Sequence, residues 1–104
     1  MKAVKEAHLK GKMMKESKFE CGEIYLTTGA NSLIAENAIN IIMLLSRHGS
    51  GDWGDLCDED KKANDSAISY GQRLLSSYDT VAGKLWIITE SGRHATTVLL
   101  PSEY

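Results

Sequence analysis

The sequence predicts an α+β domain in which an antiparallel sheet of about four strands packs against one long apolar helix and one polar helix. Three observations predict this fold class. A segment rich in β-forming residues comes first, at 23–28. Two segments with helical periodicity follow, at 32–47 and 58–70. Three alternating segments, at 73–78, 84–90 and 93–100, complete the order β-α-α-β-β-β.

Length and charge predict how the chain is organised. A chain of 104 residues suits one domain, and 42% apolar with 25% charged residues is ordinary for a globular protein. Residues 1–18 hold six lysines against two glutamates, a local charge of +4. We therefore expect 1–18 to be a basic, frayed or helical N-terminal extension and 19–104 to be a single α+β domain.

The first strand and the long helix have recognisable boundaries. Gly29 follows the strand, and Asn31 or Ser32 offers an N-cap for the helix. Apolar residues cover a wide face of 32–47, so this helix is expected to lie across the sheet as the central core element. Gly49 is expected to end it in the left-handed conformation.

The second half of the chain is also delimited by turn and cap residues. The polar helix over 58–70 is expected to be capped by Asp55 or Asp58 and closed by Gly71. Residues 79–83 form a glycine-containing hairpin loop, and residues 91–92 form a two-residue turn. Pro101 ends the last strand, because proline donates no ladder hydrogen bond.

The stretch HGSGDWGDLCDED, residues 48–60, concentrates the residue types that carry chemistry. Trp53 either folds back to plug the core or stands at a recognition surface. His48 is either an ordinary helix C-terminal residue or a general base oriented by Asp52. The acids suit helix caps and solvated turns, and no calcium-loop pattern, nucleophile elbow or phosphate-binding glycine pattern is present. We predict no metal and no cofactor.

A second polar group is expected at the last hairpin. Glu90 and Arg93 flank the predicted turn, so they should form a cross-strand ion pair, and Arg73 opens the neighbouring strand. Trp86 is expected to belong to the core. Together with the 48–55 loop these residues form our candidate ligand or partner surface: His48, Asp52, Trp53, Arg73, Glu90 and Arg93.

Charge and hydropathy constrain the partners. Residues 19–104 carry six bases and twelve acids, a net −6, which argues against a nucleic-acid partner. No secretory signal and no membrane-spanning segment is evident, so we expect a cytoplasmic protein without a membrane partner. Cys21 and Cys57 are expected to be reduced thiols. A sheet face left bare by the helices would favour a homodimer.

Four sequence blocks occur in order: RHGSGDWGDL, RLLSSY, KLWIITE and TTVLLPSEY. In this combination the chain resembles an uncharacterised family of small bacterial proteins carried on plasmids, gene cassettes and other mobile elements. The resemblance covers about residues 19–104 and implies a mobile-element origin, without an activity. The positions that the resemblance marks, without assigning them roles, are His48, Gly51, Asp52, Trp53, Gly54, Arg73, Tyr78, Trp86, Glu90, Arg93 and Thr97.

Three functional hypotheses follow. The first is a non-catalytic binding module that engages a protein or small molecule through the 48–55 loop and neighbouring strand ends. The second is a small hydrolase or metal-assisted enzyme using His48, Asp52 and Glu90. The third is an inhibitor of a bacterial defence nuclease, in which the acidic body mimics nucleic acid. Whether the protein is an enzyme stays open on the sequence alone.

Overall fold

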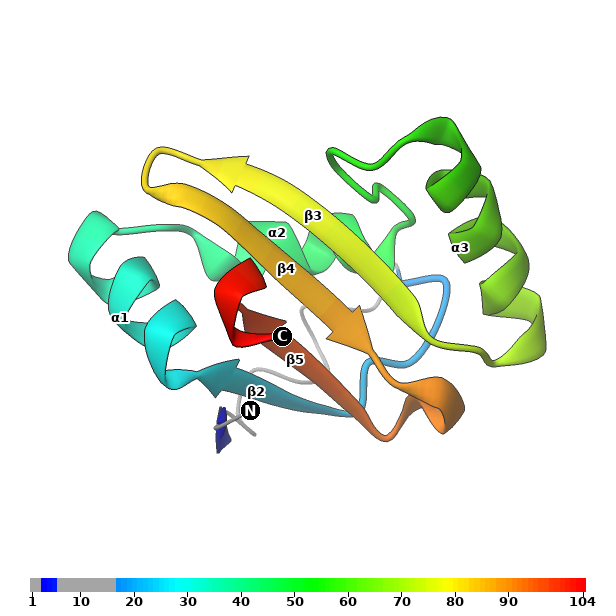
Figure 1. The fold of residues 1–104 in the computed structure, drawn as a ribbon. Coiled ribbons are helices and arrows are strands. Elements are labelled where there is room, and N and C mark those ends of the chain that lie inside the picture. The colour runs from blue at the N-terminus through cyan, green and yellow to red at the C-terminus, as the bar shows by residue number, and fades with distance from the viewer. Residues whose placement is uncertain (1–2, 6–16) are drawn as a thin grey trace.

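The fold is a mixed β-sheet with three α-helices, and it is taken from a computed structural model that describes residues 3–5, as backbone only, and 17–104 (Figure 1). The strands are β1 (Ala3–Lys5), β2 (Glu23–Thr27), β3 (Leu74–Thr80), β4 (Gly83–Thr89) and β5 (Ala95–Leu99). Their order across the sheet is β1-β2-β5-β4-β3. The α+β class predicted from the sequence is thereby confirmed.

The sheet is not purely antiparallel, and that part of the prediction is wrong. β2 runs parallel to β5, in register from Glu23↔Ala95 to Leu26↔Val98. The other three pairs, β1 with β2, β3 with β4 and β4 with β5, are antiparallel. Hydrophobic alternation reports which face a side chain occupies, and it carries no information about strand direction. The long connection between β2 and β5, which contains the three α-helices and strands β3 and β4, returns the chain in the same direction.

One face of the sheet carries the main core. Alternate residues of four strands point to this face and pack against α1 (Thr28–Asn37), α2 (Ile41–Gly49) and the segment that precedes β2. The buried members are Cys21, Ile24, Leu26, Ala30, Leu44, Leu45, Tyr78, Leu85, Ile87 and Val98. A smaller cluster of Trp53, Ala67 and Leu74 lies where α3 (Asp58–Tyr70) meets β3.

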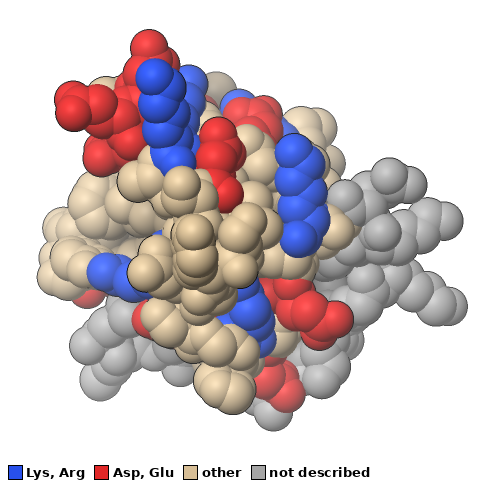
Figure 2. Space-filling view, turned by 90° about the vertical axis from the view of Figure 1, so that its right-hand side faces the viewer, with Lys and Arg blue, Asp and Glu red and all other residues tan. Residues whose placement is uncertain are grey.

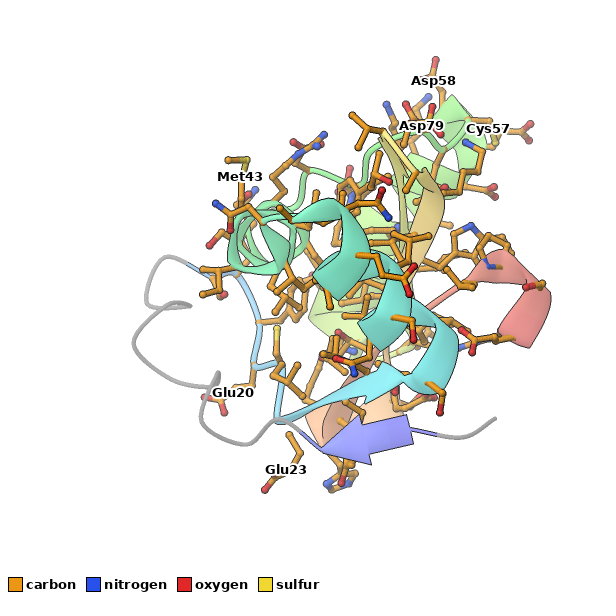
Figure 3. All side chains as sticks on the ribbon, turned by 90° about the vertical axis from the view of Figure 1, so that its left-hand side faces the viewer. Glu20, Glu23, Met43, Cys57, Asp58 and Asp79 are labelled. Carbon is orange, nitrogen blue, oxygen red and sulfur yellow. The ribbon has the colours of Figure 1, made fainter. Side chains whose placement is uncertain are left out.

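The single long helix predicted over 32–47 is two helices, α1 (Thr28–Asn37) and α2 (Ile41–Gly49). Ala38 adopts a left-handed conformation with φ 52° and ends α1. Asn40 starts α2 by accepting a hydrogen bond from the amide of Met43. The N-cap of α1 is Thr27 rather than Asn31 or Ser32, since its hydroxyl accepts from the amide of Ala30 at 3.1 Å. α2 supplies the central core contact, and the exposed Met43 lies on its outer side (Figure 3).

The polar helix is confirmed as α3 (Asp58–Tyr70), closed by Gly71 at φ 65°. Its N-cap is Cys57, while Asp58 lies in the first turn with two further acids. After α2 the left-handed residue is Gly51, at φ 86°, rather than the predicted Gly49. The extension predicted over 1–18 falls mostly outside the described residues, although Ala3–Lys5 is a strand.

The connection from β4 to β5 is longer than the two-residue turn predicted at 91–92. It contains the 3-10 helix η3 (Ser91–Arg93), with left-handed φ angles at Gly92 and Arg93. After β5 comes a second 3-10 helix, η4 (Pro101–Glu103), which lies across the sheet on the face opposite α2 (Figure 1). We call the side that carries η4 the front face.

Candidate functional site

The loop after α2 is docked along the edge of the sheet. Gly54 forms a parallel β-bridge with Ser77 of β3. The amide of Ser77 donates to the Trp53 carbonyl at 3.1 Å, and the amide of Asp55 donates to the Ser77 carbonyl at 2.6 Å. A Cβ on Gly54 would lie 2.0 Å from the Ser77 carbonyl oxygen, so only glycine permits this approach. Gly54 therefore serves the close packing of the loop against β3.

His48 lies in the last turn of α2 and is fully buried. Its Nδ1 is 2.5 Å from the Ser76 hydroxyl, and its Nε2 is 2.8 Å from the Thr89 hydroxyl. Burial, together with the nearby charge of Arg93, lowers the pKa of His48 to about 3. The imidazole is therefore neutral at ordinary pH and both ring nitrogens are occupied. A general base that takes protons from a substrate needs access that this side chain lacks.

Asp52 does not orient His48, because it pairs with Arg47 instead. The Arg47 guanidinium donates to the two Asp52 carboxylate oxygens at 2.6 and 3.3 Å. The hydrogen bond from Arg47 holds the pKa of Asp52 below its ordinary value. The Asp52 backbone carbonyl accepts a hydrogen bond from the Tyr78 hydroxyl at 2.6 Å. Asp52 therefore braces the loop against β3 from the solvent side.

Trp53 is 3% exposed, which confirms the core-plug interpretation over the recognition-surface one. Its ring stacks on Phe19 at 6.1 Å and meets the His48 ring edge-on at 5.7 Å. The indole N–H donates to Asp65 of α3 at 2.9 Å. Neither Phe19 nor Asp65 was singled out by the sequence, since both are too distant along the chain to be associated with Trp53 by spacing.

Arg93 acts as a clamp inside the fold. Its guanidinium donates to the carbonyls of Gln72 at 2.5 Å and Ala67 at 3.0 Å, at the C-terminal end of α3. The same group lies 5.5 Å from the centre of the Phe19 ring. This cation lies at the negative end of the α3 dipole, where the Ala67 carbonyl also accepts from the amides of Gly71 and Gln72. The predicted ion pair between Arg93 and Glu90 is not formed, because both residues lie within the connection 90–94 instead of facing each other across a two-residue turn.

Glu90 pairs with Arg73, directly across the ends of β3 and β4. Their closest N–O distance is 4.0 Å, and their side chains are 43% and 48% exposed. The Arg73 guanidinium also lies 5.0 Å above the ring of Tyr104, which in turn meets the ring of Trp86 at 5.7 Å and 65°. Trp86 is half-buried on the front face and so is not a fully buried core residue. We call Arg73, Trp86, Glu90 and Tyr104 the front-face cluster.

The six predicted site residues therefore fall into three places and form no common pocket. The buried His48 and Trp53 and the half-buried Arg93 surround Phe19. Asp52 lies at the surface with Arg47. Arg73 and Glu90 lie on the front face, because each adjoins a core-facing residue in a strand that alternates.

The remaining acids and thiols show no arrangement typical of a metal site. Within residues 17–104, no group of three His, Cys, Asp or Glu side chains is placed to hold a metal ion. Asp58, Glu59 and Asp60 fill the first turn of α3, where acids are favoured by the helix dipole. Cys21 is buried, and burial raises its pKa, whereas Cys57 is exposed. No helix of the described part has the length and apolar character needed to cross a membrane.

The acids of the body also do not form one row. Asp58 and Asp79 lie at one end of the molecule and Glu20 and Glu23 at the other (Figure 3). On the face shown in Figure 2, acidic and basic side chains lie next to one another. Nucleic-acid mimicry needs acids spaced like phosphates, without interleaved bases. Nothing in this distribution favours the nuclease-inhibitor hypothesis.

Comparisons of the chain with protein-family models, curated proteins and solved structures gave no match.

Proposed function

We propose that this protein is a non-catalytic interaction module that binds a protein partner through the front-face cluster. The observation that carries the proposal is the contact of three residues at the surface. Tyr104 is 66% exposed and touches both Arg73 and Trp86. Tryptophan, tyrosine and arginine are the residue types that dominate binding energy at protein interfaces.

The chemistry of the cluster suggests what a partner would offer. The two aromatic rings suit an apolar or aromatic anchor, while the half-exposed Arg73–Glu90 pair offers one charge of each sign at the rim. An exposed ion pair contributes little binding free energy by itself. Specificity would come from the position of the Arg73–Glu90 pair beside the two rings. Because the sequence resembles proteins carried on mobile elements, we also propose that the interaction serves an accessory function of such an element.

The enzyme hypothesis receives no comparable support. Its three residues, His48, Asp52 and Glu90, lie in three different surroundings, and His48 has no exposed surface. A general base and its orienting acid must be in hydrogen-bond reach of each other. These separate surroundings favour a binding function over an enzymatic one.

Photocrosslinking tests the proposal. A photoreactive phenylalanine analogue is placed at position 104, and at position 70 in a matched control, because Tyr70 is a second exposed tyrosine, on α3. After irradiation in bacterial lysate, we expect a specific protein adduct at position 104 and none at position 70. Adducts at both positions alike, or at neither, would contradict the proposal.

Affinity measurements with the identified partner complete the test. Tyr104→Ala and Arg73→Glu are each expected to weaken binding about tenfold or more, as for interface hot spots. Tyr70→Ala is expected to leave the Kd unchanged. Equal changes in Kd for the three substitutions would contradict the assignment of the binding surface to the front-face cluster.

A further inference from the structure

A continuous chain of buried hydrogen bonds links His48 to three strands. Ser76 of β3 lies on one side of the ring, with its hydroxyl 2.5 Å from Nδ1. On the other side the Thr89 hydroxyl of β4 lies 2.8 Å from Nε2 and 2.7 Å from the hydroxyl of Thr96. The Thr96 hydroxyl, on β5, donates to the Cys21 carbonyl at 2.7 Å. We call this chain of groups the hydroxyl relay.

The carbonyl at the end of the relay sets the direction of every bond in it. A carbonyl oxygen only accepts, so the single hydroxyl proton of Thr96 is used there. Thr96 must then accept from Thr89, which uses the proton of Thr89. The Thr89 oxygen must accept in turn from His48, so Nε2 carries a proton. The neutral ring has its lone pair on Nδ1, which accepts from the Ser76 hydroxyl.

We infer that the hydroxyl relay admits one tautomer of neutral His48, with the proton on Nε2, and that it is a proton-sensitive lock on the 48–55 loop. A proton taken up from solvent would go to Nδ1. Ser76 would then have to change from donor to acceptor, while a cation would stand in a buried site. Release of the ring into water removes both the reversed hydrogen bond at Ser76 and the buried positive charge. The loop that follows His48 then leaves the edge of β3 together with the ring.

The groups facing His48 do not compensate a positive charge. Arg93, from the turn between β4 and β5, is a second cation near the ring. The aromatic neighbours are Phe19 at 5.3 Å and Trp53 at 5.7 Å. Asp65 is engaged by the indole of Trp53. Asp52 is held by Arg47, and the Tyr78 hydroxyl donates to the Asp52 carbonyl, so neither side chain pairs with the ring.

The segment that would open is the 48–55 loop, because its docking on β3 depends on contacts with His48. Its ring touches Trp53, and the residues on either side of Gly54 bond to Ser77 of β3. The amides of Asp55 and Ser77 report on this docking, because both donate across the junction between loop and strand. Amides of the central strand β4 report on unfolding of the whole sheet.

Two measurements on the intact protein test the inference. Long-range ¹H–¹⁵N spectra of the imidazole at pH 7 are expected to show a protonated Nε2 and an unprotonated Nδ1 for His48, with the exposed His94 as internal comparison. A protonated Nδ1 in the neutral ring would overturn the relay. In Thr96→Val, where Thr89 is free to donate to the ring, a mixture of tautomers is expected, and Thr96→Ser should restore the single form.

Hydrogen exchange tests the lock itself. Between pH 6 and pH 4.5, corrected protection factors at Asp55 and Ser77 should fall about tenfold per pH unit while staying below those of β4 amides. In His48→Gln, which cannot take up the proton, they should not depend on pH. Protection that is independent of pH in the natural protein, or equal at the loop and at β4, would overturn the lock.

Discussion

Residues that suggest chemistry in the sequence are used here as polar members of the core. His48 is fully buried with both ring nitrogens bonded, and Trp53 is buried with its N–H on Asp65. Buried polar groups are tolerated when every donor and acceptor is satisfied, and such groups favour one packing arrangement over others. The residues at 48–60 therefore hold the loop against β3, and the acids of this stretch face solvent.

The pKa of His48 makes the stability of the protein depend on pH. The pKa falls from an ordinary 6.5 to about 3 on folding, so the unfolded chain binds a proton first as the pH is lowered. Stability is therefore complete above about pH 6.5 and decreases toward pH 3, by about 1.4 kcal/mol per pH unit. Urea unfolding at pH 7, 6 and 5 measures this slope, and His48→Gln is expected to reduce it by that amount. An unchanged slope in the variant would show that other groups cause the dependence.

At the scale of elements, the break between α1 and α2 is the main departure from the sequence pattern. Apolar residues continue from 33 to 45, which predicts one helix. In the structure the amide of Ala38 bonds to the Ile34 carbonyl, and Asn40 caps the following helix. Both helices contribute buried residues to the same core: Ala30 from α1, and Leu44 and Leu45 from α2. An alanine at a left-handed C-cap gives little warning of such a break, because glycine or asparagine normally occupies it.

Ala38→Gly is expected to stabilise the protein by about 0.5–1 kcal/mol, because glycine adopts φ 52° without the steric cost that a Cβ imposes. Ala35→Gly is the matched control. Ala35 is also exposed but lies inside α1, so there the same substitution should destabilise by about 0.5–1 kcal/mol. Thermal and urea unfolding of both variants provide the comparison. Destabilisation by both substitutions would mean that Ala38 is not held in the left-handed region.

At the scale of the whole molecule, Glu103 joins distant parts of the chain. Its carboxylate accepts hydrogen bonds from the Thr27 hydroxyl and from the amides of Gly29 and Leu100. Partial burial acts to raise the pKa of Glu103, but these hydrogen bonds lower it below its ordinary value overall. The parallel strands β2 and β5 end side by side, and Glu103 ties the segments that leave them. The same tether places Tyr104 against Trp86 on the front face.

Glu103→Gln is expected to cost about 1–2 kcal/mol, since the amide replaces one acceptor oxygen with a donor and leaves a partner amide unpaired. Glu36→Gln, at an exposed position of α1, is the control and should change the free energy of unfolding by less than about 0.5 kcal/mol. Chemical denaturation at pH 7 measures both. Equal, small effects would show that the tether at Glu103 does not contribute to stability.

What the sequence determined by itself is local. Alternation and turn residues predicted four strand segments, and helical periodicity with the closing glycine predicted α3, because these signals depend on neighbours in the chain. The predicted N-cap, Asp55 or Asp58, was wrong, since Cys57 holds that position. They also indicated that His48, Trp53 and Arg93 are unusual, without saying why.

Only the tertiary structure determined the contacts between residues that are distant along the chain. The parallel pairing of β2 with β5, the burial of His48 between Ser76 and Thr89, and the separation of the predicted site into three places all depend on contacts between distant residues. The front-face cluster arises in the same way, since Arg73 and Tyr104 meet only after the C-terminal turn crosses the sheet. Periodicity assigns a side chain to a face, but which residues meet across that face is set by strand order and direction.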